Sequence, residues 1–81
     1  IGAHEIHTIE ACEQAGLSPD FYMKTFNRLE YACPDFERTD KVMRQVTTPW
    51  IAFKVLAAGR LSPKEGFKQA LDAGADFLCV G

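Results

Sequence analysis

The sequence predicts an α/β fold in which short parallel strands alternate with helices. Two observations favour this class. Apolar runs of strand length recur along the 81 residues, and segments with helical periodicity separate them. Strands that alternate with helices pair in parallel through right-handed crossovers. The expected strands are residues 20–26, 50–57 and 76–80, and the expected helices are residues 5–15, 39–47 and 62–73.

The first helix is predicted from its apolar face and from its end. Ile6, Ile9 and Cys12 fall on one side of a helix at residues 5–15. Gly16 stands where a left-handed residue ends a helix.

The second helix, residues 39–47, follows a polar loop over 27–38 that is long for a compact connection. Thr39 or Asp40 is the expected N-cap. A stripe facing the core is expected from Val42, Met43 and Val46.

The third helix, residues 62–73, has the clearest beginning in the chain. Ser62 is the expected N-cap, Pro63 takes the first helical position, and Glu65 completes a capping box. Gly74 is expected to end the helix. Its core-facing residues are expected to be Phe67, Ala70 and Leu71.

The strands are nearly continuous in apolar residues, which is typical of strands covered on both faces. The residues expected to be best buried are Phe21, Met23, Ile51, Phe53, Val55, Phe67, Leu71, Phe77 and Leu78.

Composition excludes several classes of function. The chain carries 11 acidic and 9 basic residues, a net charge of −2, and no basic cluster, so nucleic-acid binding is not expected. No apolar run approaches the ~20 residues of a membrane helix, and no signal peptide is visible. Cys12, Cys33 and Cys79 have no metal-site or disulfide spacing. Three free thiols in the cytoplasm are expected, with Cys12 and Cys79 acting as small core residues.

Both ends of the chain suggest a larger sheet. Residues 1–4 resemble the end of a strand, and the last predicted strand has no helix after it. A parallel sheet of three or four strands would leave apolar edges unpaired. We therefore expect one segment, residues 1–81, forming the C-terminal part of a (β/α)8 barrel from about strand five or six to strand eight. A self-contained small domain and a half-barrel homodimer that closes its own edges are the alternatives.

The last thirty residues resemble strands seven and eight of phosphate-binding TIM barrels. The resemblance rests on Ala57-Ala58-Gly59-Arg60, the capped helix and Val80-Gly81. It implies that Gly59, Arg60 and Gly81 hold a phosphate, since the loops after these strands often do so at a helix N-terminus. Simple turn geometry is the alternative for both glycines.

Two strands that contain a lysine resemble the deoxyribose-phosphate aldolase group. Residues 20–25 (DFYMKT) and 52–59 (AFKVLAAG) are similar to its paired strands. The resemblance implies a class I lyase in which Lys24 forms the Schiff base and Lys54 depresses its pKa. The sequence departs from the pattern by one extra residue before Lys24 and by Ala57-Ala58-Gly59 in place of a glycine pair. An acidic partner for proton transfer is not found in the chain.

The Schiff-base chemistry of two neighbouring lysines is physically reasonable without the family resemblance. A free lysine has a pKa of ~10.4 and is not nucleophilic when protonated, whereas low-dielectric surroundings and a second ammonium group favour the neutral amine. If both lysines face the barrel interior, their amines converge near its catalytic end. The alternative is that each lysine emerges at the rim of the sheet, solvated or ion-paired.

Other polar residues have weaker patterns. Residues 4–7 (HEIH) are not a zinc motif, because their histidines are three apart. No metal and no cofactor are therefore expected, although His4 could line a site. Asn27 and Arg28 are expected at the mouth of the site, with an exposed polar loop as the alternative. The aromatic residues Tyr31, Phe36 and Trp50 are expected to pack.

Two functions are consistent with these patterns. The first is a class I aldolase-like lyase acting on a small phosphorylated or hydroxylated carbonyl compound. The second is a non-catalytic or incomplete phosphate-binding barrel segment. Whether the chain is an enzyme is left open by the sequence.

Overall fold

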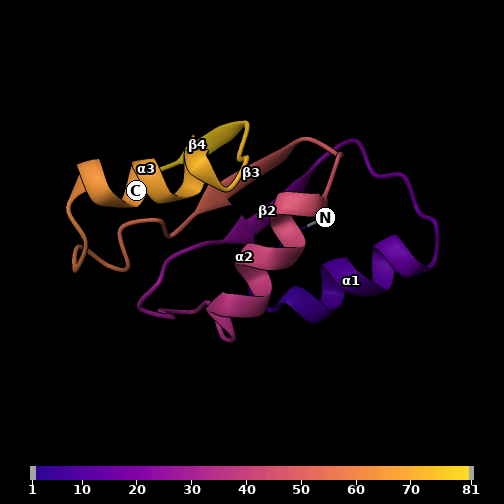
Figure 1. The fold of residues 1–81 in the computed structure, drawn as a ribbon, viewed down its shortest axis with the longest axis horizontal. Helices are drawn as coiled ribbons and strands as arrows, with labels where there is room; N and C mark the ends of the chain where they lie inside the picture. Colours follow the sequence, from indigo (N-terminus) through magenta and orange to yellow (C-terminus); the bar gives the residue numbers. More distant parts are fainter. Residues whose placement is uncertain (1, 81) are drawn as a thin grey trace.

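The computed structural model describes residues 2–80, and it confirms an α/β fold with a parallel sheet and alternating strands and helices (Figure 1). The four strands lie in the order β1-β2-β3-β4, and each pair is parallel. None of the helices described is long and apolar enough to cross a membrane. The elements are β1 Gly2–Ala3, α1 Ile6–Gln14, β2 Tyr22–Thr25, α2 Phe36–Gln45, β3 Trp50–Phe53, α3 Pro63–Asp72 and β4 Phe77–Cys79.

Local sequence signals place α1 and α3 as predicted. Gly16 and Gly74 follow these helices with positive φ angles of 72° and 101°, which glycine adopts without steric cost. The Ser62 hydroxyl accepts a hydrogen bond from the Glu65 amide at 3.2 Å. The Glu65 side chain does not close the capping box but pairs with Arg28, at 2.9 Å.

The second helix begins earlier than predicted. Its N-cap is Asp35, whose carboxylate accepts a hydrogen bond from the Arg38 amide at 3.4 Å. Thr39 and Asp40 were expected to cap the helix, but both lie inside it. Thr39 is buried in the interior, and Asp40 pairs with Arg44. The loop before α2 is correspondingly shorter.

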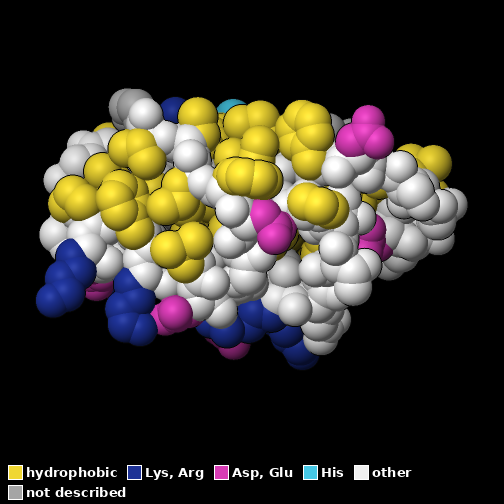
Figure 2. Space-filling model, turned by 90° about the horizontal axis from the view of Figure 1, so that it is seen from above, with side chains coloured by type: hydrophobic (Ala, Val, Ile, Leu, Met, Phe, Trp, Pro, Cys, Tyr) yellow, Lys and Arg dark blue, Asp and Glu magenta, His cyan; other side chains and the backbone are white. Residues whose placement is uncertain are grey.

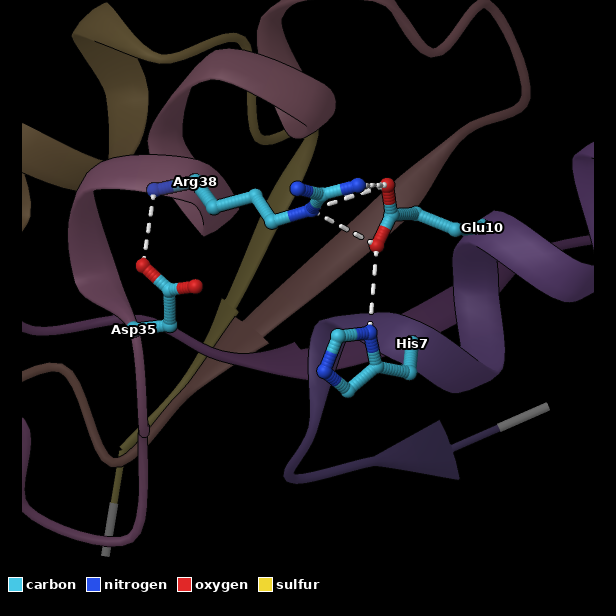
Figure 3. A network of polar contacts seen from close by, with 4 residues as sticks. All are labelled: His7, Glu10, Asp35 and Arg38. Atoms are coloured by element: carbon cyan, nitrogen blue, oxygen red, sulfur yellow. Dashed lines mark hydrogen bonds and ion pairs between the residues drawn. The ribbon is translucent and has the colours of Figure 1, made fainter.

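An ion pair joins α1 to α2 (Figure 3). The Arg38 guanidinium donates to both oxygens of Glu10, at 2.7 to 3.0 Å. His7 lies on the other side of the same carboxylate, at 3.4 Å. The hydrogen bonds from Arg38 hold the pKa of Glu10 below its usual value.

The two faces of the sheet differ, which corrects the predicted core. Cα partners in a parallel sheet point their side chains to the same side, and Ala3, Lys24, Ala52 and Leu78 are successive partners. This face packs in one cluster with helix residues such as Met43. A sequential strand order with right-handed crossovers places every helix on one side of the sheet.

The opposite face has no helix among the described residues. Phe21, Leu71 and Phe77 were expected in the core but are 44%, 52% and 64% exposed. The prediction was wrong for Phe21 and Phe77 because it assumed helices on both faces of the sheet. Leu71 lies in α3, where Gly66 and Ala70 are the buried residues and Leu71 faces solvent. Figure 2 shows apolar side chains gathered on one side of the molecule. Val55 is buried, as expected. The remaining expected core residues are half-buried: Met23, Ile51, Phe53, Phe67 and Leu78.

The three cysteines are free, as predicted, but they occupy two environments. Cys12 and Cys33 are buried. Cys79 was expected in the core and is exposed, because it lies in β4 on the face without helices. Its register partner Phe53 shares that face.

Candidate functional site

Lys24 lies inside β2 on the face that the helices cover, and its side chain is fully buried. Its ammonium group donates to the His4 carbonyl at 2.6 Å and to the Thr25 carbonyl and hydroxyl at 3.0 and 2.9 Å. The Cys33 sulfur lies 3.8 Å away. The amine is therefore enclosed by the end of β1, the end of β2 and the loop before α2.

Burial lowers the pKa of Lys24, since a charged amine loses its hydration inside the protein. Cys33 and Glu5 oppose this shift and favour the charged form. A lowered pKa is the property that a nucleophilic lysine needs. The direction of the shift agrees with the chemistry expected for this residue, but its cause is burial and not a second lysine.

Lys54 lies one residue beyond β3 and is exposed. Its φ angle of 55° turns the backbone out of the strand. The Lys54 ammonium lies 5.8 Å from the centroid of the Tyr31 ring. Arg60 approaches the same ring, with its guanidinium carbon at 5.9 Å. Both distances are within the range of cation–π contacts.

A cleft of about 490 Å³ opens at the carboxyl ends of β3 and β4. It lies beside the last residue of each strand, Phe53 and Cys79. The described lining contains one cation, Lys54, and no carboxylate. The described residues that line it are Tyr31, Phe53, Lys54, Val55, Leu56, Ala58, Gly59, Cys79 and Val80.

Of the predicted phosphate-binding residues, Gly59 lines this cleft. Arg60 is the next residue in the chain and is not part of the described lining. Gly59 has a φ angle of 85°, so the turn itself requires a residue that tolerates this conformation. Gly81 lies outside the described residues.

The two predicted catalytic lysines are not brought into one cavity. Lys54 lines the cleft, whereas Lys24 does not. The partner of Lys24 on β3 is Ala52, so Lys54 lies two residues beyond the equivalent position.

His4 is exposed, and its ring packs edge-on against Phe53 at 5.5 Å. Within residues 2–80, no cluster of three or more His, Cys, Asp or Glu side chains could hold a metal ion.

Tyr31 and Asn27 contribute to this site in ways that sequence reasoning missed. Tyr31 was expected to pack, but it is 38% exposed and lies beneath two cations. Asn27 was expected at an open mouth, but it is fully buried and bonds to backbone atoms of Tyr31 and Lys54. An aromatic residue in the loop after a strand was the available signal for Tyr31.

Comparison with known proteins gives no relative: no family model, no curated protein and no solved structure matches the chain.

Proposed function

We propose that the chain binds a small phosphorylated carbonyl compound in the cleft at the carboxyl ends of β3 and β4. The observation that carries the proposal is that two cations approach the ring of Tyr31, which lines this cleft; Lys54 lines the cleft as well, whereas Arg60 is not part of the described lining. Lys54 and Arg60 both lie within 6 Å of the Tyr31 centroid. Neither of them forms an ion pair within residues 2–80.

The chemistry of the cleft favours a phosphate over other anions. A phosphate monoester carries nearly two negative charges, which two cations can neutralise. Apolar side chains such as Phe53, Leu56 and Val80 line the remainder of the cleft and can contact a short carbon skeleton. The proposal concerns binding and does not require catalysis. It therefore also covers a non-catalytic phosphate-binding barrel segment.

The position of the cleft in the fold supports the same assignment. Ligands of open parallel sheets bind at the carboxyl ends of the strands, and barrels of eight strands hold phosphates at this edge. We propose that the segment is part of such a barrel, because its strands are parallel, sequential in order and free of helices on one described face. The edge strands β1 and β4 would pair with further strands or with a second copy of the chain.

Titration with inorganic phosphate, followed in ¹H–¹⁵N NMR spectra, tests the binding proposal. Shifts are expected at the amides of residues 54–60. Lys54→Ala and Arg60→Ala should each weaken binding about tenfold, the equivalent of ~1.4 kcal/mol for one lost charge-assisted contact.

Lys41→Ala is the matched control, because Lys41 is an exposed lysine of α2 that does not line the cleft. This variant should bind phosphate as the unmodified chain does. Equal losses in all three variants would indicate only nonspecific attraction to positive charge. Phosphate-dependent shifts confined to residues outside 54–60 and away from Tyr31, Cys79 and Val80, which also line the cleft, would place the site elsewhere.

A Schiff-base lyase is the second candidate function, and the lowered pKa of Lys24 favours it. Because the amine is fully buried, a carbonyl compound could reach it only if the loop before α2 opens. Borohydride trapping with glyceraldehyde 3-phosphate tests this candidate. A covalent adduct at Lys24 that is lost in Lys24→Met would support a lyase. Adducts only at exposed lysines would contradict it.

Sedimentation equilibrium of the original chain and of the Phe77→Lys variant tests whether a second copy of the chain pairs with the edge strands of the sheet. Phe77 is 64% exposed on the edge strand β4, and a charge there disfavours edge pairing. A dimer that Phe77→Lys dissociates would support a half-barrel homodimer. A monomer at all concentrations would contradict it.

A further inference from the structure

Two strained loops meet at the cleft. Within residues 2–80, every non-glycine residue with positive φ lies in the loop after β2 or in the turn after β3. A conformation of this kind costs about 1 kcal/mol or more per residue, and it persists only where the surroundings enforce it. The first loop contains Glu30, Ala32 and Asp35, and the second contains Lys54, Ala57 and Ala58.

The Asn27 side chain ties these two loops together. Its amide oxygen accepts a hydrogen bond from the Tyr31 amide at 2.9 Å. Its amide nitrogen donates to the Tyr31 carbonyl at 2.9 Å and to the Lys54 carbonyl at 3.0 Å. The residue is fully buried, so each of these polar atoms needs a partner within the protein.

Only a carboxamide satisfies this arrangement at this size. The site presents one N–H group and two carbonyl oxygens, which match the acceptor and the two donors of asparagine. Aspartate has the same shape, but its carboxylate cannot donate to the carbonyls of Tyr31 and Lys54.

We infer that Asn27 is a positioning residue that sets the phosphate affinity of the cleft by fixing Lys54 relative to Tyr31. The inference rests on the proposed function, because the two residues that Asn27 joins are the ring and one of the cations at the cleft. Asn27 does not line the cleft itself. Its effect on a ligand therefore passes through Lys54 and Tyr31.

A double-mutant cycle with inorganic phosphate tests this inference. Asn27→Asp should weaken binding about tenfold in the unmodified chain but less than about twofold when Lys54 is already alanine, because coupled residues are not additive. Equal losses in both backgrounds would overturn the inference, and so would no loss in either. Asn27→Ala, which deletes all three bonds, should reproduce the same non-additivity if Asn27→Asp folds poorly.

A measurement without ligand separates this inference from the proposed function. The Tyr31 ring should shift the ε-methylene protons of Lys54 upfield in NMR spectra, since the ammonium lies 5.8 Å from the ring centroid. Asn27→Asp should abolish that ring-current shift. Met43→Ala is the control, since it removes a buried core side chain of α2 and should keep the shift.

The ligand-free spectra decide the positioning role even if the unmodified chain binds no phosphate. In that case the proposed function fails, and loss of the shift in Asn27→Asp would still support positioning of Lys54 by Asn27. A ring-current shift that persists in Asn27→Asp would overturn the inference.

Discussion

Gly66 in α3 has no room for a side chain, so Gly66→Ala should destabilise the protein. A Cβ atom at this position would lie 2.5 Å from the Val55 carbonyl oxygen and 2.8 Å from a methyl carbon of Leu56. Because the closer neighbour is backbone, α3 or the turn after β3 must move by about 0.5 Å or more, and such overpacking typically costs about 1–3 kcal/mol. Alanine also favours a helix by about 0.5–1 kcal/mol relative to glycine. We expect a net loss of about 1–2 kcal/mol in the free energy of unfolding.

Urea denaturation, monitored by the fluorescence of the buried Trp50, measures this change. Lys64→Ala is the control, since Lys64 is exposed in the same helix, and its effect should stay within about 0.5 kcal/mol. Val55 and Leu56 also line the cleft, so Gly66→Ala should weaken phosphate binding as well. The reasoning would be refuted by a Gly66→Ala variant that is more stable than the original chain, as helix propensity alone predicts.

Three further predictions concern contacts that hold the elements together. Arg38→Met should reduce the loss of folding stability at acid pH. The lowered pKa of Glu10 stabilises the folded chain above about pH 4.5, and this contribution is lost as the pH falls through the pKa of Glu10 in the folded state. Because Arg38 is the main cause of the lowered pKa, the variant lacks most of this contribution. Urea midpoints at pH 7 and pH 3 measure it, and an unchanged difference between them would contradict the prediction. Asp76→Ala should cost about 1.5 kcal/mol, because the carboxylate accepts from the amide of the buried Trp50 at 3.0 Å; a midpoint equal to that of the original chain would contradict this. Acetylation followed by mass spectrometry should modify Lys24 more slowly than exposed lysines, and equal rates would show that its amine is not enclosed.

The order and type of the elements could be predicted from sequence because local chemistry specifies them. The cap at Ser62 and the glycine ends of α1 and α3 act through hydrogen bonds and backbone freedom within a few residues. The beginning of α2 was missed because Asp35, its N-cap, has a φ angle of 55° in a loop without glycine. Asp35 is a residue type that favours the N-cap position, but Thr39 and Asp40 carry the same local signal, and the tertiary contacts that enforce the positive φ of Asp35 cannot be read from the sequence.

The face of each strand could not be predicted, because the strands carry apolar residues on both sides. In β3, Trp50 and Ala52 are buried while Ile51 and Phe53 are half-buried. Period-2 analysis needs polar residues on one side to fix the direction of the strand. The predicted core residues of β2, β3 and β4 consequently included four on the open face, Met23, Ile51, Phe53 and Phe77, and missed Tyr22 and Trp50.

The lysine repeat illustrates how this ambiguity affected the candidate site. Lys24 and Lys54 occupy similar positions in two similar sequence segments, and this similarity suggested equivalent places on neighbouring strands. The register pairs Lys24 with Ala52, and β3 ends at Phe53, before the second lysine. An offset of two residues therefore separates a buried amine, held by carbonyl groups, from an exposed amine at the cleft. The same offset makes Lys54 available to an anion from solvent, which a lysine equivalent to Lys24 on β3 would not be.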